Sequence, residues 1–572
     1  MKKIFILIFL CLSQVAQYPG AALAKPLYAD RKGDQHISDL VLLCKVWGML
    51  KYHHPAVTKG QYNWDQELIK LLPSYEAVRN KVERNQVLLN LVKALGRVSK
   101  GTPFPDSLLR DVKMKPDYTW VSQKSLGMQL ADLLTQVSHY HDTTEQHYLK
   151  YLAEDNIVLP SFVNEEPYAQ MALPDPQYRL LAVYRYWNII EYWYPYKYLA
   201  KQNWNKCLPI FIQDALAANT EAAYVRFIQK MVGTIKDSHA TVTAQKVEML
   251  KGRWFLPLRV QFIENQAVVT SIDAKLPAAA LRVGEVIKEV DGVPVSTFVH
   301  RQRPYVSASN EAVVLREVAR LLVRSDDSVS HLKVAALDGK VRQCTLSNIP
   351  FARATLAPVY NFPYQRDSSC FMLTNGVLYV NPGRFTNNQV AWVKQHLPAA
   401  KGLVLDARQY PRTGAGAVFN LLQSCLLSGK GPMCKFSSAV KGFPGLFRFA
   451  PPFVIGETNT NYYRGRVIIL VDENTQSTSE FLTMGYQLAP GALVVGSTTA
   501  GADGNVTYPF QLPGGIVTKI TGLGVYYPDG KETQQIGIVA KVKVTPTLTG
   551  FRAGKDELLD KAIQIILTEK SN

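Results

Sequence analysis

The chain has 572 residues, of which 47% are hydrophobic and 19% are charged. This composition describes a folded globular protein, and the length predicts two to four domains rather than one core. The formal net charge is +18, but the basic residues are spread along the chain. A nucleic-acid groove usually has clustered Lys and Arg with aromatic residues between them, so we expect no nucleic-acid partner and only weak attraction to anionic surfaces.

Residues 1–24 have the pattern of a secretory signal peptide. Lys2 and Lys3 precede the apolar run Ile4–Leu12, and Ala22-Leu23-Ala24 forms a small-residue cleavage site. The apolar run is too short to span a bilayer. We therefore predict an exported protein, periplasmic or associated with the cell envelope, with no integral membrane span after cleavage at Lys25.

Six cysteines remain after this cleavage, too few for a disulfide framework in so long a chain. Export would permit a pair, and Cys425 with Cys434 is the closest candidate. The sequence leaves this pairing open.

Two stretches of the N-terminal half are related. Trp47 and Trp64 recur 140 positions later as Trp187 and Trp204. In each copy the pattern predicts three helices, the third followed by a glycine that stops it. We therefore predict duplicated three-helix units at residues 25–100 and 176–245.

The two units differ after their last helix, because only the second continues into Asp-Ser-His. His239 therefore belongs to one copy alone, which indicates that one unit has a structural role and the other contributes to function. The alternative is a partly exposed loop histidine. Between the units, residues 101–175 form a mixed linker region in which His139, His141 and His147 have a spacing that could bind zinc. The stretch is polar and offers no further ligand nearby, so we expect neither a metal nor a cofactor.

Residues 246–345 change to short strands. Trp254–Val260, Ala267–Ile272 and Gly284–Val290 are strand-like, and Asp291-Gly292 predicts a hairpin turn. The segment LRVGEVIKEVDGVPV resembles one found in PDZ domains, which add an extended peptide to a sheet edge. Arg316–Val323 is the helix expected beside such a groove. The alternative is an ordinary small β-domain.

Strands and helices alternate in residues 346–572. Buried strand patterns at Gly376–Val380, Gly402–Asp406 and Val467–Asp472 are separated by helical patterns at Asn388–Leu397 and Ala417–Leu427. This alternation predicts an α/β domain with a largely parallel sheet. A final amphipathic helix is expected near the C-terminus.

The centre of this domain is a strand–turn–helix–strand unit at residues 466–505. Ser477 stands at its turn, where free N–H groups and the helix dipole can stabilise an oxyanion. Ser477 and Glu480 also make a Ser-x-x-Glu capping box, which needs no chemistry. The loop Gln409–Gly414 follows a neighbouring strand, so we expect it to form a second wall of the same cleft.

Taken in order, these features resemble the serine peptidases that include the C-terminal processing (tail-specific) proteases and the tricorn core. The resemblance covers about residue 178 to the end and rests on KDSHATV at 236–242, the PDZ-like block, GLVLDARQYP at 402–411, VDENTQSTSEF at 471–481, VVGSTTAGADG at 494–504 and IGIVAKVKVTPT at 536–547. It implies an α/β multidomain fold in which a parallel-sheet catalytic core of the ClpP/crotonase type is joined to a PDZ-like domain. It also implies a serine peptidase acting on peptides or on unfolded or C-terminal protein segments.

The resemblance implies roles for individual residues. Processing proteases use a lysine in a Gly-rich loop, which corresponds to Gly501–Gly504 here, and Ala502 stands at the position of that lysine. Tricorn-like members use a histidine from an Asp-Ser-His segment instead. Ser477 is therefore implied as the nucleophile and His239 as the general base, with Ser238 helping to orient the imidazole. The backbone N–H of Thr478 is implied as one oxyanion donor.

Departures from the family pattern leave a second function open. Gln534 stands where the family often has a glutamate, and a glutamine can orient an imidazole but cannot neutralise an imidazolium. Pro411 has no N–H for a second oxyanion donor, so Tyr410 or Arg412 would have to supply it. With the lost lysine, these changes also fit a catalytically inactive protein that binds peptides or an apolar ligand on the same scaffold. The retained Ser477 and His239 favour the peptidase.

Overall fold

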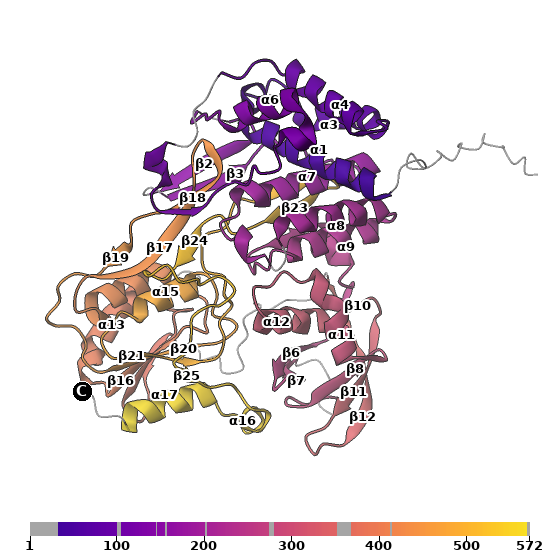
Figure 1. Ribbon diagram of the computed structural model, residues 1–572. Coiled ribbons are helices and arrows are strands. Elements are labelled where there is room, and N and C mark those ends of the chain that lie inside the picture. The colour runs from indigo at the N-terminus through magenta and orange to yellow at the C-terminus, as the bar shows by residue number, and fades with distance from the viewer. Residues whose placement is uncertain are drawn as a thin grey trace, which may run out of the picture.

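The computed structural model describes residues 33–99, 105–144, 146–154, 157–200, 203–273, 280–351, 368–411 and 414–568. The predicted signal peptide lies outside these ranges. Figure 1 shows a helical part at the top, with an α/β part and a smaller β-rich part side by side below it. No helix within the described ranges is long and apolar enough to cross a bilayer.

The helical part contains two similar sets of helices. Their bounds are Gly33–His53 (α1), Trp64–Glu76 (α3) and Lys81–Ala94 (α4), then Pro176–Trp193 (α7), Trp204–Ala217 (α8) and Glu221–Gly233 (α9). Trp47 and Trp64 each donate an indole N–H to the other's carbonyl oxygen, at 3.2 and 3.0 Å. Trp187 and Trp204 repeat this exchange at 3.2 and 3.1 Å. The repeated tryptophans thus fix the same helix pairing in both sets.

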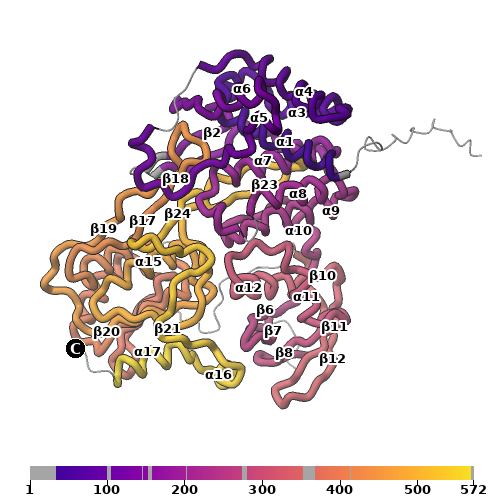
Figure 2. Tube along the Cα trace, viewed as in Figure 1, coloured from indigo at the N-terminus to yellow at the C-terminus, as the bar shows by residue number. Residues whose placement is uncertain are grey.

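The two sets pack through their first helices into one core. The Tyr184 hydroxyl on α7 donates to the Leu40 carbonyl on α1 at 2.8 Å, and the Asn188 amide donates to the Cys44 carbonyl at 3.1 Å. The chain also returns to this core from its C-terminal part. Strand β23 (Ile516–Lys519) pairs with β4 (Thr241–Thr243), directly after His239. Figure 2 shows β23 among the N-terminal helices, away from the parallel strands β20 (Arg466–Val471) and β21 (Ala492–Gly496) of the α/β part.

The β-rich part is a sheet of strand order β12-β11-β8-β7-β6, with β9 added to β8. Its strands are Leu258–Ile263 (β6), Gln266–Ile272 (β7), Val286–Val290 (β8), Val293–Pro294 (β9), Val329–Ala335 (β11) and Val341–Ser347 (β12). The expected turn joins β8 to β9, where Asp291 and Gly292 have φ values of 49° and 76°. Helix α12 (Glu311–Leu322) lies beside the edge strand β6.

The strand predicted over Trp254–Val260 is interrupted. Pro257 cannot donate to a ladder, and the segment divides into β5 (Trp254–Phe255) and β6. Strand β5 leaves the main sheet and pairs with β10 (Arg324–Ser325) and β13 (Ile349–Pro350).

The α/β part is built on a six-stranded sheet of order β14-β15-β16-β20-β21-β25. The strands are Cys370–Met372 (β14), Val377–Val380 (β15), Gly402–Asp406 (β16), Arg466–Val471 (β20), Ala492–Gly496 (β21) and Val542–Lys543 (β25). All neighbouring strands are parallel except β14 with β15, so the predicted largely parallel sheet is confirmed. Its helices are Asn387–His396 (α13), Ala415–Leu421 (α14), Thr478–Tyr486 (α15) and Glu557–Thr568 (α17).

A buried ionic cluster anchors the C-terminal helix to this sheet. Arg408 follows β16 and donates two hydrogen bonds to Asp406, at 2.7 and 2.8 Å, and two to Asp556, at 2.9 and 2.8 Å. Asp556 also accepts from the N–H of Leu559 in the first turn of α17. The cluster therefore joins β16 to α17 beside the loop that precedes α14.

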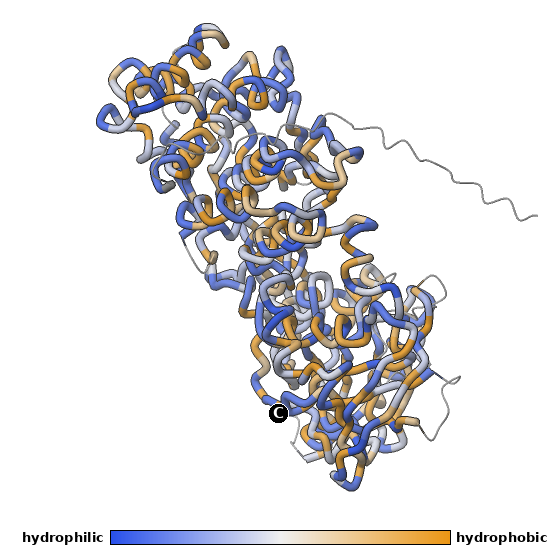
Figure 3. The backbone as a smooth tube through the Cα atoms, turned by 90° about the vertical axis from the view of Figure 1, so that its right-hand side faces the viewer, coloured by the Kyte–Doolittle hydropathy of each residue, from blue (hydrophilic) through white to orange (hydrophobic). Residues whose placement is uncertain are grey.

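An antiparallel sheet, which the sequence analysis did not predict, connects the α/β part to the helices. Strands β17 (Gly431–Val440) and β18 (Phe443–Phe449) form a long hairpin that pairs with β1 (Val112–Met114), β19 (Phe453–Ile455) and β24 (Gly524–Tyr526). Strand β1 belongs to the stretch expected to be a linker, so part of that stretch is built into the fold. Figure 3 shows apolar segments along the whole length of the molecule. They recur because the helical part, the α/β part and the β-rich part each have a hydrophobic core of their own.

All six cysteines of the described ranges are free. The candidate disulfide between Cys425 and Cys434 is not formed in this structure.

Candidate active site

Ser477 occupies a sharp turn between strand β20 and helix α15. Its backbone has φ 54° and ψ −121°, a left-handed conformation that favours glycine and is strained for a residue with a side chain. The serine is partly buried. Such strained turns from strand to helix can expose a nucleophile above a sheet.

The carboxylate of Glu480 fastens this turn to the Gly-rich loop. One oxygen accepts from the Thr499 hydroxyl at 2.5 Å and from the Gly501 N–H at 2.8 Å. The other accepts from the N–H groups of Ala502 at 3.0 Å and Ser477 at 3.2 Å. Burial raises the pKa of Glu480, and these four hydrogen bonds oppose the rise. The capping residue therefore also clamps the loop that faces the serine.

The backbone N–H of Thr478 makes no hydrogen bond within the described ranges and lies at the start of α15. Its position suits the predicted oxyanion donor, because the first N–H groups of a helix have no intrahelical partner. Tyr410 lies beside it, with its hydroxyl 3.2 Å from the Thr478 hydroxyl. Arg412, the alternative second donor, lies outside the described ranges.

His239 follows helix α9 and is almost fully buried, with 7% of its surface exposed. Its Nδ1 lies 3.0 Å from the Thr521 hydroxyl, and its backbone N–H donates to Asp237 at 3.0 Å. Burial lowers the pKa of His239, Asp237 raises it, and Lys519 lowers it. The net direction is downward, so the imidazole is neutral at neutral pH and can accept a proton.

The two polar residues expected to support His239 have other partners. The Ser238 hydroxyl is bonded to Ser309, at 3.0 Å from its hydroxyl and 2.8 Å from its N–H, rather than to the imidazole. Gln534 is buried and directs its amide to Asp237 at 3.5 Å. Among the described residues neither side chain is hydrogen-bonded to the ring, and the imidazole is hydrogen-bonded to Thr521 instead.

Helix α12 of the β-rich part and the two residues before it contact three segments of the candidate site. Ser309, just before the helix, bonds to Ser238, and Asn310 donates to the Thr499 carbonyl of the Gly-rich loop at 2.8 Å. Further along, Arg316 donates to the Glu473 carbonyl at 2.6 Å and to the Gln476 side chain at 2.8 Å. One helix therefore holds the histidine segment and the serine turn in a fixed relation.

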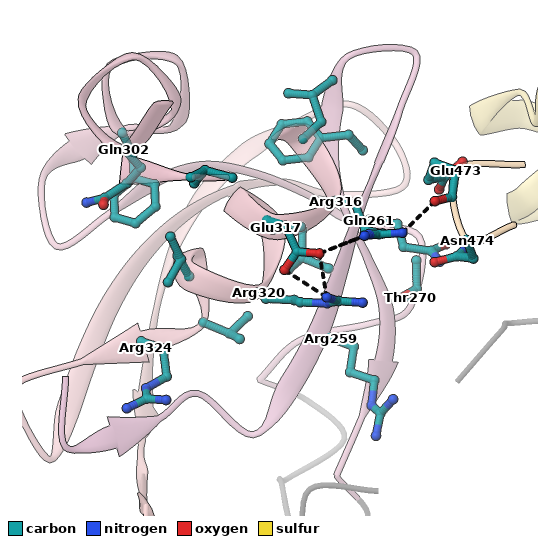
Figure 4. A pocket seen from close by; sticks show the side chains of 18 of the residues that line it. Arg259, Gln261, Thr270, Gln302, Arg316, Glu317, Arg320, Arg324, Glu473 and Asn474 are labelled. Atoms are coloured by element: carbon teal, nitrogen blue, oxygen red, sulfur yellow. Dashed lines mark hydrogen bonds and ion pairs between the residues drawn. The ribbon is translucent and has the colours of Figure 1, made fainter. Parts of the chain in front are cut away.

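A cavity of about 1740 Å³ lies between strand β6, helix α12 and the turn after β20. Figure 4 shows Arg316 directed across it from α12 toward Glu473, with Glu317 between Arg316 and Arg320. Gln476, the residue before Ser477, is part of its wall. The groove of the β-rich part thus reaches the serine turn.

The Gly-rich loop connects Ser477 to the His239 network. The N–H of Ser477 donates to the Ala502 carbonyl at 3.1 Å, and Gly504 packs against Thr521, the residue bonded to His239. No hydrogen bond joins the Ser477 hydroxyl to the imidazole within the part of the chain that the structure describes. Resting catalytic hydrogen bonds often tighten only when substrate binds.

The sequence analysis missed Thr521, Asp237 and Ser309 as parts of this site. Asp237 stands in the motif that contains His239, which was a usable signal. Thr521 and Ser309 lie in segments without any such motif, 282 and 71 positions from His239 and Ser238 respectively.

His141 and His147 of the linker region each pack against an aromatic ring. His141 stacks on Phe443 with ring centroids 4.2 Å apart, and His147 packs edge-on against Tyr148. Across the described ranges no cluster of three or more His, Cys, Asp or Glu side chains is arranged to hold a metal ion.

Asp503 is a buried carboxyl group in the Gly-rich loop. One oxygen accepts from the Gly504 N–H at 2.8 Å, and the other has no partner among the residues that the structure describes. Burial, and then the nearby Glu480, raise the pKa of Asp503 well above its usual range. A raised pKa in the folded state means that this group lowers stability as the pH rises above about 4, its range in an unfolded chain.

We therefore expect Asp503→Asn to stabilise the protein at neutral pH. The gain in the free energy of unfolding should be largest at pH 7.5, at about 1.4 kcal/mol for each tenfold change that folding makes in the acid dissociation constant of Asp503, and should shrink toward pH 4. Urea unfolding at both pH values measures it. Asp132→Asn, on an exposed position of helix α6 (Met128–Ser138), is the matched control and should change neither value. A gain that is equal at both pH values would contradict the assignment of the cost to ionisation.

Residues 376–544 match the family described as Peptidase family S41. The structure of mature CPAF complexed with lactacystin is similar with a TM-score of 0.55 and 16% identity, over 69% of this chain and 99% of that chain. Mature CPAF alone is similar with a TM-score of 0.53 and 15% identity, over 69% of this chain and 99% of that chain. The photosystem II D1 C-terminal processing protease has a TM-score of 0.37 and 17% identity, over 64% of this chain and 93% of that chain. No curated protein sequence matches the chain. The likeness to CPAF establishes a shared fold.

Proposed function

We propose that this serine peptidase works through Ser477 as nucleophile and His239 as general base; residues 376–544 match the Peptidase family S41. Its substrates in this proposal are peptides or unfolded or C-terminal protein segments. The predicted export would place the activity in the periplasm or at the cell envelope.

The observation that carries the proposal is the turn at Ser477. Its strained backbone is held by two hydrogen bonds from the serine N–H, to Glu480 and to Ala502, and the next N–H has no partner among the described residues. A helix cap alone accounts for the hydrogen bond to Glu480, but it does not require the strained backbone or the bond to Ala502. The free Thr478 N–H supports an oxyanion role, because it points from the helix start where negative charge is stabilised.

In the proposed reaction the Ser477 oxygen attacks the scissile carbonyl carbon while its proton passes to His239. The imidazole then gives this proton to the leaving amine as the acyl-enzyme forms, and water repeats the sequence to release the acid. A neutral histidine is required for the first step, and the lowered pKa of His239 supplies it.

Labelling with a fluorophosphonate tests the proposal. The full-length protein should be labelled covalently, and Ser477→Ala should remove the label. Ser479→Ala is the matched control, because Ser479 lies two residues away and is 2% exposed. Its hydroxyl has no hydrogen-bond partner among the described residues. That variant should be labelled like the wild type.

The alternative function is a peptide or apolar-ligand binder without catalysis. It is favoured by the absence of a hydrogen bond between Ser477 and His239 within the described ranges and by Ala502 in place of the family's lysine. Measurable binding of a peptide to a wild-type protein that resists the fluorophosphonate would establish this alternative and reject the proposed mechanism.

A further inference from the structure

The hydroxyl group of Thr521 lies between the imidazole of His239 and the carboxylate of Asp237. Its oxygen is 3.0 Å from His239 Nδ1 and 3.0 Å from Asp237 Oδ1. Asp237 and Thr521 have no exposed surface, and His239 has 7%. The pairing of β23 with β4 creates this arrangement, because it brings the end of β23 beside the segment before β4.

The other partners of Asp237 determine the direction of each hydrogen bond. Its carboxylate accepts from the backbone N–H groups of Thr521, at 2.8 Å, and His239, at 3.0 Å. The Gln534 amide also approaches it at 3.5 Å. These groups can only donate, so Asp237 acts as an acceptor and the Thr521 hydroxyl donates to it. The Thr521 oxygen then accepts from His239. The ring proton is therefore on Nδ1, and Nε2 carries the lone pair.

We propose that Asp237 and Thr521 are positioning residues that hold His239 in the tautomer with a basic Nε2 and stabilise its protonated form through the threonine hydroxyl. The inference rests on the proposed function of His239. During the reaction Nε2 takes the Ser477 proton and later returns it to the leaving amine. Thr521 keeps its own proton, and Asp237 remains the negative end of the network. Gln534 is neutral and cannot supply that charge.

The charged groups that act on His239 are Asp237, which raises its pKa, and Lys519, which lowers it. Asp237→Asn removes the raising effect. The acid limb of the pH profile of kcat/KM should then move to lower pH, while its plateau falls about 10²–10⁴-fold, as when the carboxylate of a triad is lost. A residue with only a structural role would leave the acid limb in place.

Variants of Thr521 distinguish the loss of its hydroxyl group from a general effect on the folded structure. Thr521→Val should reduce kcat by at least about 10-fold, because the ring loses its acceptor, and Thr521→Ser should restore most of the activity. Thr518→Val is the matched control. Thr518 lies on β23, three residues before Thr521, is fully buried, and its hydroxyl has no partner among the described residues. Equal losses in Thr521→Val and Thr518→Val, with no rescue by serine, would overturn the proposal.

A spectroscopic test does not depend on activity. In the Ser477→Ala protein labelled with ¹⁵N-histidine, the His239 ring should show the Nδ1–H tautomer, with its signals identified by their loss in a His239→Gln variant. Adding Thr521→Val should remove this tautomer preference. An Nε2–H ring would overturn the proposed positioning of His239 by Thr521 and Asp237, even in an active enzyme. An inactive wild-type protein with an Nδ1–H ring would reject the proposed function while supporting the positioning of His239 by Thr521 and Asp237.

Discussion

Replacing Ser477 with alanine is expected to lower kcat/KM for a peptide substrate by about 10⁵–10⁶-fold, the loss seen when the serine of a catalytic triad is removed. The effect is large because the alanine protein has no oxygen to form the acyl-enzyme, and the unbonded Thr478 N–H can stabilise an oxyanion only if one forms. Residual hydrolysis should not respond to His239, since the base then has no hydroxyl to activate. A variant with more than a tenth of the wild-type activity would exclude Ser477 as the nucleophile.

Ser477→Gly should be equally inactive but more stable than Ser477→Ala. The turn has φ 54° and ψ −121°, which a glycine adopts without strain and an alanine does not. Relief of about 1–3 kcal/mol of strain, less about 0.4–1 kcal/mol for the greater freedom of glycine in the unfolded chain, leaves a net gain of about 1 kcal/mol. Urea unfolding of the two variants measures the difference. Equal stability would show that the serine turn stores no strain.

The parts of the fold that could be predicted are those encoded by local patterns. Strand β16 has the bounds expected from its run of buried residues, and helix α15 begins directly after the serine that was expected to precede it. The Asp291-Gly292 turn was equally readable, because both residues needed positive φ values. The sequence placed Ser477 correctly at a strand–helix junction for the same reason.

The parts that escaped prediction depend on contacts between distant segments. The hairpin of β17 and β18 has no distinctive alternation, and its partners β1 and β24 come from opposite ends of the chain. The partner of His239 could not be found either, because Thr521 is one of many threonines until β23 pairs with β4. Gln534 was assigned to the ring from its place in a family pattern, whereas in the structure the nearer group is Asp237. Motifs therefore identify the reacting groups, whereas pairing between distant segments determines which residues form hydrogen bonds to them.

Loss of the guanidinium in Arg408→Leu is expected to destabilise the protein by about 3–5 kcal/mol, the usual effect of removing one member of a buried ionic cluster. Asp406 and Asp556, which are 1% and 8% exposed, would remain in the interior without their four hydrogen bonds from Arg408. Urea unfolding followed by circular dichroism measures the change. Lys531→Leu, which breaks an exposed pair with Asp529, is the control and should unfold like the wild type.

The same cluster predicts how this loss depends on pH. Buried carboxylates without a cation take up protons readily, so the destabilisation by Arg408→Leu should shrink as the pH falls toward 4. The triple variant Asp406→Asn, Arg408→Leu, Asp556→Asn should recover part of the stability at pH 7.5, because positions 406 and 556 then carry no charge. A loss that is the same at both pH values and persists in the triple variant would assign the effect to packing volume. The main contribution of Arg408 to stability is therefore to neutralise the two carboxylates, Asp406 and Asp556, that are buried at the junction of β16 and α17.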